Sequence, residues 1–186
     1  MKRLLATIAF FTLFSLPASA LSVKGVNVSD TMQVDEQELV LNGAGMRTKF
    51  FVDAYVAALY LPTPSTNATD IVNGDSLMAV RLYINSGLIN AKRMSESTRD
   101  GFVRSTNGNI APIETEMEEM ISAFKEEVKE GDVFDLIYVP EEGVRVFRNG
   151  EQKSLVKGMD FKKAMFGIWL SDNNIQKNLR KAMLNQ

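Results

Sequence analysis

The sequence predicts one α+β domain in which an antiparallel β-sheet carries helices packed on one side. Three observations favour this class. A long β-prone segment runs from Leu39 to Pro62, a β-meander lies between Gly131 and Gly158, and several stretches show the apolar spacing of helices. Because these strands and helices come in mixed blocks rather than in regular alternation, they indicate an α+β arrangement.

The first residues are predicted to be a cleaved signal peptide, residues 1–20. Lys2 and Arg3 form a short basic region, and the apolar run from Leu4 to Leu16 is too short to span a bilayer. Ala18-Ser19-Ala20 has the small-x-small pattern of a cleavage site. We expect a mature domain, residues 21–186, that is periplasmic or secreted and has no further membrane span. An uncleaved membrane anchor is the alternative.

The composition excludes several classes of function. The chain has 186 residues and a net charge of -2, which argues against a nucleic-acid binder. It has no cysteine and no histidine, so we expect no disulfide, no Ser-His-Asp or Cys-His catalysis and no imidazole metal site. We assign no metal-binding residue and no cofactor.

The segment from Leu39 to Pro62 dominates the mature chain. Its Asn42-Gly43-Ala44-Gly45 stretch is interpreted as a turn, and an apolar run begins near Arg47. Strand side chains alternate between faces, so the even positions from Met46 to Tyr60 form an apolar face that we expect in the core. The odd positions are expected to form the wall of a partly polar cleft: Arg47, Lys49, Phe51, Asp53, Tyr55, Ala57 and Leu59. The alternative is that Arg47 and Lys49 only keep a sheet edge soluble.

Other elements of the first half follow from local patterns. Val23–Val28 and Gln37–Leu41 are strand candidates, and Leu77–Ile84 is a strong one. Thr69 and Asp70 are predicted to cap a short helix that ends at Gly74.

Helices and a hairpin are predicted in the second half. Residues 88–104 have an inner stripe at helical spacing and a basic outer side, and Glu114–Lys129 is an amphipathic helix with an acidic first half. Asn149-Gly150 is a strong hairpin signal, because a type I′ turn needs positive φ at both central residues. Phe161–Leu170 is predicted to be a helix capped by Asp160, and a last helix begins at Asn173 or Asn174.

Three pieces of the sequence together resemble the chalcone isomerase-like family, in its bacterial exported branch. Gly43-Ala44-Gly45-Met46-Arg47 is similar to the glycine-x-glycine-x-arginine opening of the family. Residues 55–61 resemble its tyrosine-containing strand, and Phe166–Leu170 followed by Ile175–Leu184 resembles its C-terminal helix pair. The resemblance implies an open-faced β-sandwich, with a large antiparallel sheet and helices layered on it.

The family contains both enzymes and binders. Its plant isomerases close a phenol onto a conjugated ketone, whereas related proteins bind fatty acids in the corresponding cleft, and both kinds share the arginine that Arg47 matches. Tyr55 stands where the isomerases use threonine and the binders tend to have tyrosine. The region 88–98 lacks the tyrosine of the isomerases, and the two polar family positions hold Asn90 and Ser97. This pattern favours binding over catalysis.

The sequence therefore predicts a non-catalytic periplasmic binder of a small amphipathic acid resembling a fatty acid. Arg47 would pair with the carboxylate, Tyr55 or Lys49 would assist, and Phe51, Ala57 and Leu59 would line the path of the tail. One alternative is an isomerase or intramolecular lyase acting on a conjugated phenolic substrate. Another is an envelope protein without a ligand, which docks a partner on its acidic helix, Glu114–Glu130.

One geometric condition applies to this site. On a straight strand Arg47 and Tyr55 would lie roughly 26 Å apart, at about 3.3 Å per residue. Both can reach one head group only if the chain turns or bulges between Lys49 and Asp53; otherwise Tyr55 is a cleft-lining or core residue and Arg47 acts with another partner.

Overall fold

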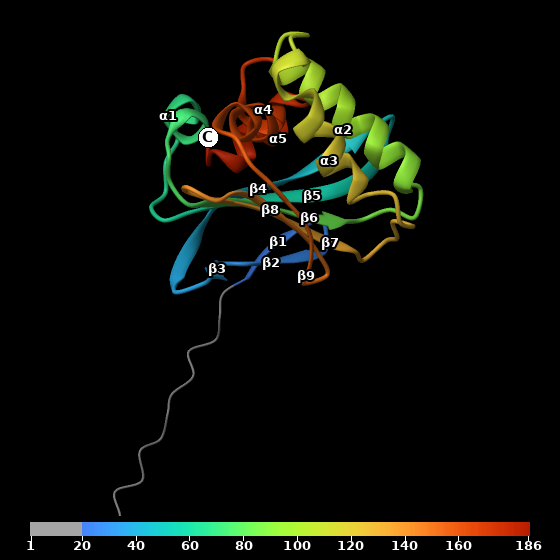
Figure 1. Ribbon diagram of the computed structural model, residues 1–186. Helices are drawn as coiled ribbons and strands as arrows, with labels where there is room; N and C mark the ends of the chain where they lie inside the picture. Colours follow the sequence, from blue (N-terminus) through green and yellow to red (C-terminus); the bar gives the residue numbers. More distant parts are fainter. Residues whose placement is uncertain (1–19) are drawn as a thin grey trace, which may run out of the picture.

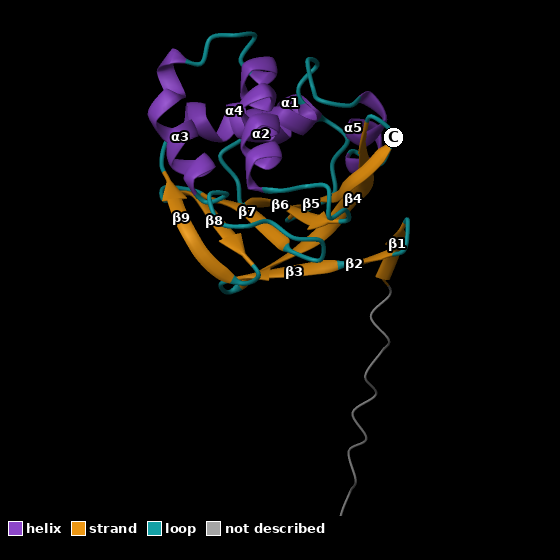
Figure 2. Cartoon of the chain, turned by 90° about the vertical axis from the view of Figure 1, so that its right-hand side faces the viewer, coloured by secondary structure: helices purple, strands orange, loops and turns teal. Residues whose placement is uncertain are grey.

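The computed structural model describes residues 20–186, so residues 1–19 of the predicted signal peptide lie outside it. A layer of helices covers one side of a curled antiparallel sheet (Figures 1 and 2). The predicted α+β class, with helices packed on a large antiparallel sheet, is confirmed. Among the helices of the described part, none is both long enough and apolar enough to cross a membrane.

The large sheet has seven strands, and each strand pairs with the next one along the chain. All pairs are antiparallel, so every connection returns the chain to a neighbouring position. A separate two-stranded hairpin precedes it, formed by β1 (Ala20–Val23) and β2 (Val26–Ser29). The strands of the large sheet are β3 (Thr31–Val34), β4 (Gln37–Lys49), β5 (Val52–Leu61), β6 (Met78–Ile84), β7 (Val133–Val139), β8 (Gly143–Arg148) and β9 (Glu151–Val156).

The helices come from the long connections and from the C-terminal part of the chain. They are α1 (Ala68–Asn73), α2 (Ala91–Ser105), α3 (Glu114–Ser122), α4 (Met159–Leu170) and α5 (Lys177–Met183), with a short 3₁₀ turn at Ala111–Ile113. Side-chain caps begin two of them: the Asn67 side chain accepts from the Thr69 and Asp70 backbone N–H groups, and Asn90 accepts from the Arg93 N–H.

The central segment is two strands rather than one. β4 ends at Lys49, Phe50 and Phe51 form a two-residue turn, and β5 begins at Val52, directly opposite Lys49. Both phenylalanines have positive φ, 49° and 65°, as a type I′ turn requires. The predicted single strand is corrected here, and the condition for bringing Arg47 and Tyr55 together is met.

The glycines of β4 do not form the predicted turn, because the strand runs through them. A Cβ on Gly43 would lie 2.2 Å from the Ala182 carbonyl oxygen, and one on Gly45 would lie 2.8 Å from the Ala182 Cβ. Glycine is therefore needed here so that α5 can pack closely on the strand. Asn42 marks a register shift next to them, and its amide donates to the Ser65 and Met183 carbonyls.

Both faces of the central strands are buried, against different partners. The even positions Val56, Ala58 and Tyr60 pack in a core with side chains of β2 and β3, as predicted for the apolar face. Phe50 was expected on the same face, but it is exposed at the turn. The odd positions Ala57 and Leu59 pack beneath the helices in a larger core. That second face was expected to be a cleft wall, yet Ala57 and Leu59 are fully buried.

A lysine is fully buried in the helix layer. Lys162 of α4 is 0% exposed, and its ammonium donates to the Ile71, Val72 and Gly74 carbonyls at 3.0, 2.8 and 2.7 Å. These carbonyls lie at the C-terminal end of α1, where backbone acceptors are otherwise unsatisfied and a positive charge is favoured. Lys162 therefore ties α4 to α1.

Several predicted boundaries need correction. Val23–Val28 is the β1–β2 hairpin, turning at Lys24 and Gly25, rather than one strand. α3 ends at Ser122 instead of continuing to Lys129, and α5 begins at Lys177 rather than at Asn173 or Asn174. Gly158, not Asp160, precedes α4. The strand near 77–84, the Asn149-Gly150 turn and the helix near 161–170 are confirmed.

Candidate functional site

Arg47 and Tyr55 are direct cross-strand neighbours. They pair in the register of β4 and β5, two residue pairs from the turn at Phe50 and Phe51. Side chains directly opposite each other in an antiparallel pair project to the same face. For Tyr55 this is the helix side, where its ring packs against the larger core and its hydroxyl meets Trp169 of α4. Both residues are half-buried.

Gln176 fixes the end of β4 to the start of α5. Its Oε1 accepts from the Arg47 Nη1 at 2.9 Å and from the Thr48 backbone N–H at 3.0 Å, while its Nε2 donates to the Met46 carbonyl at 3.1 Å. The Arg47 Nη1 also donates to the Thr48 carbonyl at 2.9 Å. Neutral groups thus hold the guanidinium through Nη1.

Tyr55 has a free proton to donate. The Trp169 Nε1 donates to the Tyr55 hydroxyl at 3.1 Å, and within the described residues the hydroxyl has no acceptor of its own. Burial raises the pKa of Tyr55, while the Trp169 indole and the Arg47 guanidinium oppose that rise. The phenol is therefore neutral at physiological pH and keeps its proton.

Arg47 also lacks a negative partner. Within residues 20–186 no Asp or Glu forms an ion pair with it, although five other arginines have such partners: Arg81, Arg99, Arg145, Arg148 and Arg180. Arg93 and Arg104 likewise have none, but both are exposed to water. A half-buried guanidinium beside an unused phenol proton forms a site that can accept an anion.

The other predicted site residues do not all join this pair. Lys49 is exposed at the rim, with its Nζ 3.4 Å from the Ser97 Oγ of α2. Phe51 is 103% exposed at the turn, so the prediction that it lines a cleft is wrong. Leu59 is on the correct face but is packed in the core.

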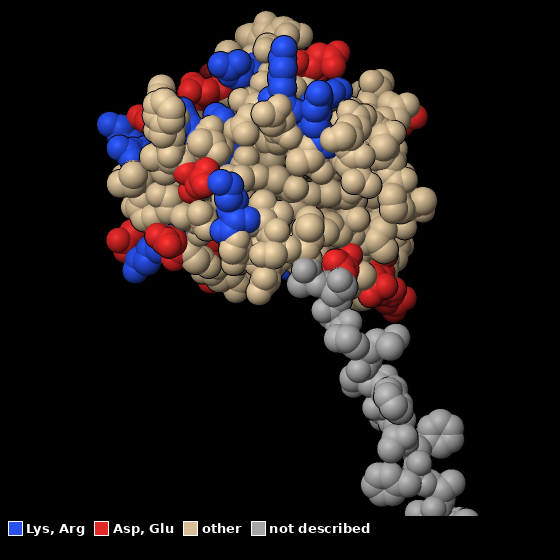
Figure 3. Space-filling view, turned by 180° about the vertical axis from the view of Figure 1, so that it is seen from behind, with Lys and Arg blue, Asp and Glu red and all other residues tan. Residues whose placement is uncertain are grey.

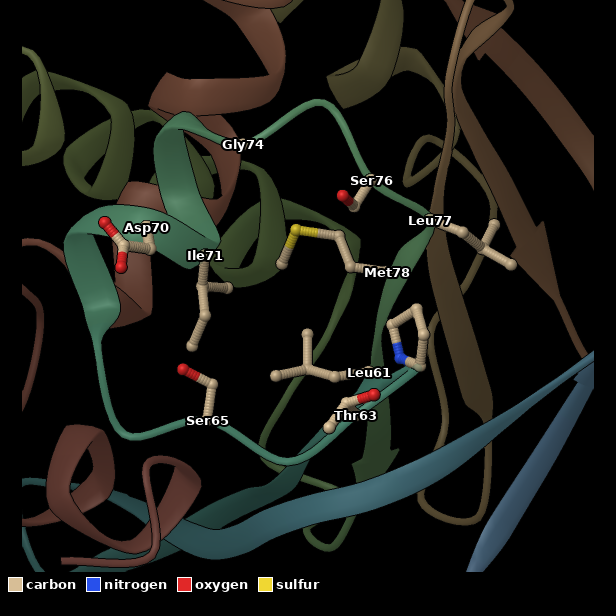
Figure 4. A pocket seen from close by; sticks show the side chains of 10 residues that line it. Leu61, Thr63, Ser65, Asp70, Ile71, Gly74, Ser76, Leu77 and Met78 are labelled. Atoms are coloured by element: carbon tan, nitrogen blue, oxygen red, sulfur yellow. The ribbon is translucent and has the colours of Figure 1, made fainter.

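Two pockets lie at the other end of the strands. One, of about 300 Å³, is bounded by the ends of β5 and β6 and by α1, with Leu61, Ile71 and Met78 turned towards it (Figure 4). Leu61 follows Tyr55 by six positions on β5, a distance of roughly 20 Å along the strand. The second pocket lies between Val34, Leu77 and Val139. Neither includes Arg47 in its lining.

Asn90 and Ser97, at the two positions compared with the isomerases, each contact another residue of the described structure. The Asn90 side chain caps α2 by accepting from the Arg93 N–H at 3.0 Å, and Ser97 lies against Lys49. In the described part of the chain, no three residues of the His, Cys, Asp or Glu type cluster in a way that could hold a metal ion.

Comparison with known proteins places the chain in a family. The chalcone isomerase-like family profile matches residues 20–185, so the chain belongs to the chalcone isomerase-like family. No curated protein matches it significantly. The crystal structure of an Arabidopsis thaliana fatty-acid binding protein is similar to it, with a TM-score of 0.68 at 18% identity. That match covers 87% of this chain and 92% of the other, and it establishes a shared fold.

Two site residues were not found from the sequence. Trp169 falls within the predicted helix Phe161–Leu170 and Gln176 near the start of the last predicted helix, but neither was singled out as a site residue. The indole N–H gave the only signal, because a buried tryptophan usually finds a polar partner. Gln176 carries no local signal, since its role depends on a contact with Arg47 that spans 129 positions.

Proposed function

We propose that this protein is a non-catalytic binder of a small amphipathic acid resembling a fatty acid, acting outside the cytoplasm after removal of its signal peptide. The carboxylate pairs with Arg47 and accepts a hydrogen bond from Tyr55. The observation that carries the proposal is this pair of neighbouring donors: within the described structure Arg47 has no carboxylate partner, and the Tyr55 hydroxyl has no acceptor.

The chemistry of the pair suits a carboxylate. The planar guanidinium presents parallel N–H donors that match two carboxylate oxygens, and the neutral phenol adds a third donor. Bonds between charged groups of this kind are worth about 1.5–3 kcal/mol each. Family membership and the likeness to a fatty-acid binding protein support the same class of ligand.

The apolar tail requires an adjustment of the core. Ala57 and Leu59, next to Tyr55 on the helix face of β5, are 0% exposed, so the layer between sheet and helices is closed. An acyl tail enters this layer only when the helices separate from β5. Each buried CH₂ is worth about 0.8 kcal/mol, so longer tails should bind more tightly if they enter.

The test is titration of the delipidated protein with saturated acids of increasing length, followed by calorimetry or ligand fluorescence. We expect affinity to rise with tail length and the acid to bind more tightly than its methyl ester. Arg47→Ala should lower affinity at least tenfold, and Tyr55→Phe less, because it removes one neutral donor.

Arg104→Ala is the matched control, since Arg104 is an exposed arginine without a carboxylate partner in the described structure. It should leave affinity unchanged. Equal binding by wild type and Arg47→Ala, or by the acid and its ester, would remove the proposed role of Arg47.

A further inference from the structure

The turn between β4 and β5 carries two exposed aromatic side chains, Phe50 and Phe51, which we call the aromatic tip. Phe50 is 85% exposed and Phe51 is 103% exposed, the highest values among the exposed large apolar residues of the described chain. The strands that carry the aromatic tip reach the right-hand margin of the molecule in Figure 1. Two adjacent phenylalanines in water are unfavourable, because burying such a side chain is worth about 1.5–3 kcal/mol.

Turn geometry does not explain these residues. Both have positive φ, which is unusual for any residue with a Cβ and strained for a bulky one. The same protein uses Asn149-Gly150 for its β8–β9 turn, with φ of 51° and 81°, and this is the favoured sequence for a type I′ turn. The aromatic tip is therefore unfavourable both for the backbone and for solvation.

Further apolar and basic side chains lie near the aromatic tip. The Lys49 ammonium lies 6.0 Å from the centre of the Phe50 ring, and its Nζ also approaches Ser97 of α2. The loop before α2 meets the start of β5, where the Asn85 N–H donates to the Ala54 carbonyl. That loop carries Leu88, which is 55% exposed.

Charge around the aromatic tip favours a negative partner. Lys49 and Arg93 have no carboxylate partner among residues 20–186, and the Arg93 Nη1 donates to the Leu88 carbonyl at 2.7 Å. Three nearby carboxylates have partners of their own, and one of them, the Glu130 Oε2, accepts from the Gly87 backbone N–H at 3.1 Å, next to Leu88. Asp53 lies 3.9 Å from the Lys24 Nζ, and Glu96 lies at the same distance from the Lys92 Nζ. Figure 3, a view from behind, shows Lys and Arg mostly in the upper half, with Asp and Glu among them, and a broad uncharged area in the middle.

We propose that the aromatic tip, with Leu88 beside it, is a docking site for an anionic lipid surface. Phe50 and Phe51 insert at the boundary between head groups and acyl chains, while Lys49 and Arg93 contact the anionic head groups. Apolar side chains flanked by basic ones are the pattern of interfacial membrane binding. The inference goes beyond acid binding and does not depend on Arg47.

A lipid surface fits this patch better than a second copy of the chain. A stable protein interface buries about 800 Å² per partner, whereas one aromatic side chain buries about 150–250 Å². A two-residue turn with one neighbouring leucine is too small for such an interface. It is large enough to insert into a soft surface and to be held there by charge.

The test is co-flotation of the protein with phosphatidylglycerol vesicles and, separately, with phosphatidylcholine vesicles. We expect binding to phosphatidylglycerol that weakens at high salt, and at least tenfold weaker binding to phosphatidylcholine. The double variant Phe50→Asn, Phe51→Gly should reduce binding to phosphatidylglycerol at least tenfold. Its thermal midpoint should stay or rise, because Asn-Gly suits the turn, and this excludes misfolding as the cause.

Val103→Ser is the matched control. Val103 is 42% exposed near the C-terminal end of α2. The substitution therefore removes an exposed apolar group that lies away from the aromatic tip. It should bind vesicles like the wild type. The proposal is overturned if the Asn-Gly variant binds vesicles normally, if wild type ignores both lipids, or if the aromatic tip instead mediates dimers seen by sedimentation.

Discussion

Two cations lie on the helix side of the sheet, at opposite ends, and they are handled differently. Lys162 is 0% exposed, and three carbonyls at the end of α1 accept its hydrogen bonds. Arg47 is half-buried at the other end, held through one nitrogen by neutral oxygens. The first has a full set of partners and the second does not.

The contrast separates a structural cation from an available one. A buried ammonium must be compensated, and the C-terminal carbonyls of a helix compensate Lys162 within the fold. A half-buried guanidinium can remain hydrated while some of its donors are unused. The described structure therefore gives Lys162 a role in stability, and it leaves Arg47 without a carboxylate partner among residues 20–186.

The largest effect should come from Lys162→Met. The substitution removes the donor that three carbonyls share, and each buried acceptor left unsatisfied costs about 1–3 kcal/mol. Urea denaturation should show a large decrease in midpoint. Lys163→Met, at the partly exposed neighbouring position, is the control and should change little. Similar urea midpoints for Lys162→Met and Lys163→Met would show that Lys162 has no special role in stability.

The next effect is on the pH dependence of stability. Burial lowers the pKa of Lys162 from its usual 10.5 to about 8, with the Asp75 carboxylate opposing that decrease and Lys163 adding to it. Between these pH values the unfolded chain binds more protons, so stability rises with pH across this window, by at most about 3 kcal/mol.

The measurement is the difference in unfolding free energy between wild type and Lys162→Met at several pH values. This difference should grow from pH 8 towards pH 10.5 and stay constant below pH 8. A difference that is flat throughout would show that the ammonium has an ordinary pKa in the folded state.

A smaller effect is expected for Gly45→Ala. Its new Cβ would lie 3.0 Å from the Leu179 Cδ1, in addition to its clash with Ala182, so α5 must move. Overpacking of this kind costs about 1–3 kcal/mol. Because α5 follows Gln176, the shift should also loosen Arg47 and weaken acid binding. Weakened stability with unchanged binding would show that Arg47 does not depend on α5.

The smallest effect on stability is expected for Arg47→Ala. No ion pair in the described structure depends on Arg47, so the free energy of unfolding should change by less than about 1 kcal/mol. Circular dichroism melts of this variant and of Arg104→Ala should nearly coincide. A large destabilisation would assign Arg47 to the same structural class as Lys162.

Local signals predicted much of the fold. The β6 strand is apolar except for Arg81, and Asn149-Gly150 is the sequence that a type I′ turn favours. The turn at Phe50 and Phe51 was missed because phenylalanine is a poor choice at positive φ. Rules based on turn-favouring residues such as Gly, Asn and Asp cannot indicate a turn formed by two phenylalanines.

Long-range contacts explain the wrong prediction of a turn at Gly43 and Gly45, and they explain why Gln176 was not predicted as a site residue. Gly43 and Gly45 suggest a turn locally, but they are needed for close contact with α5, far along the chain. The partnership of Arg47 with Tyr55 was expected only conditionally, and the turn between them fulfils the condition. Gln176 and the burial of Lys162 depend on packing that no short pattern encodes.

The packing of α5 against β4 has a consequence for the order of folding. The Asn42 amide donates to the Met183 carbonyl across 141 positions, so the packing of β4 depends on residues far along the chain. Contacts of such high sequence separation slow folding. We therefore expect β4 to stay incompletely packed until α5 has been synthesised.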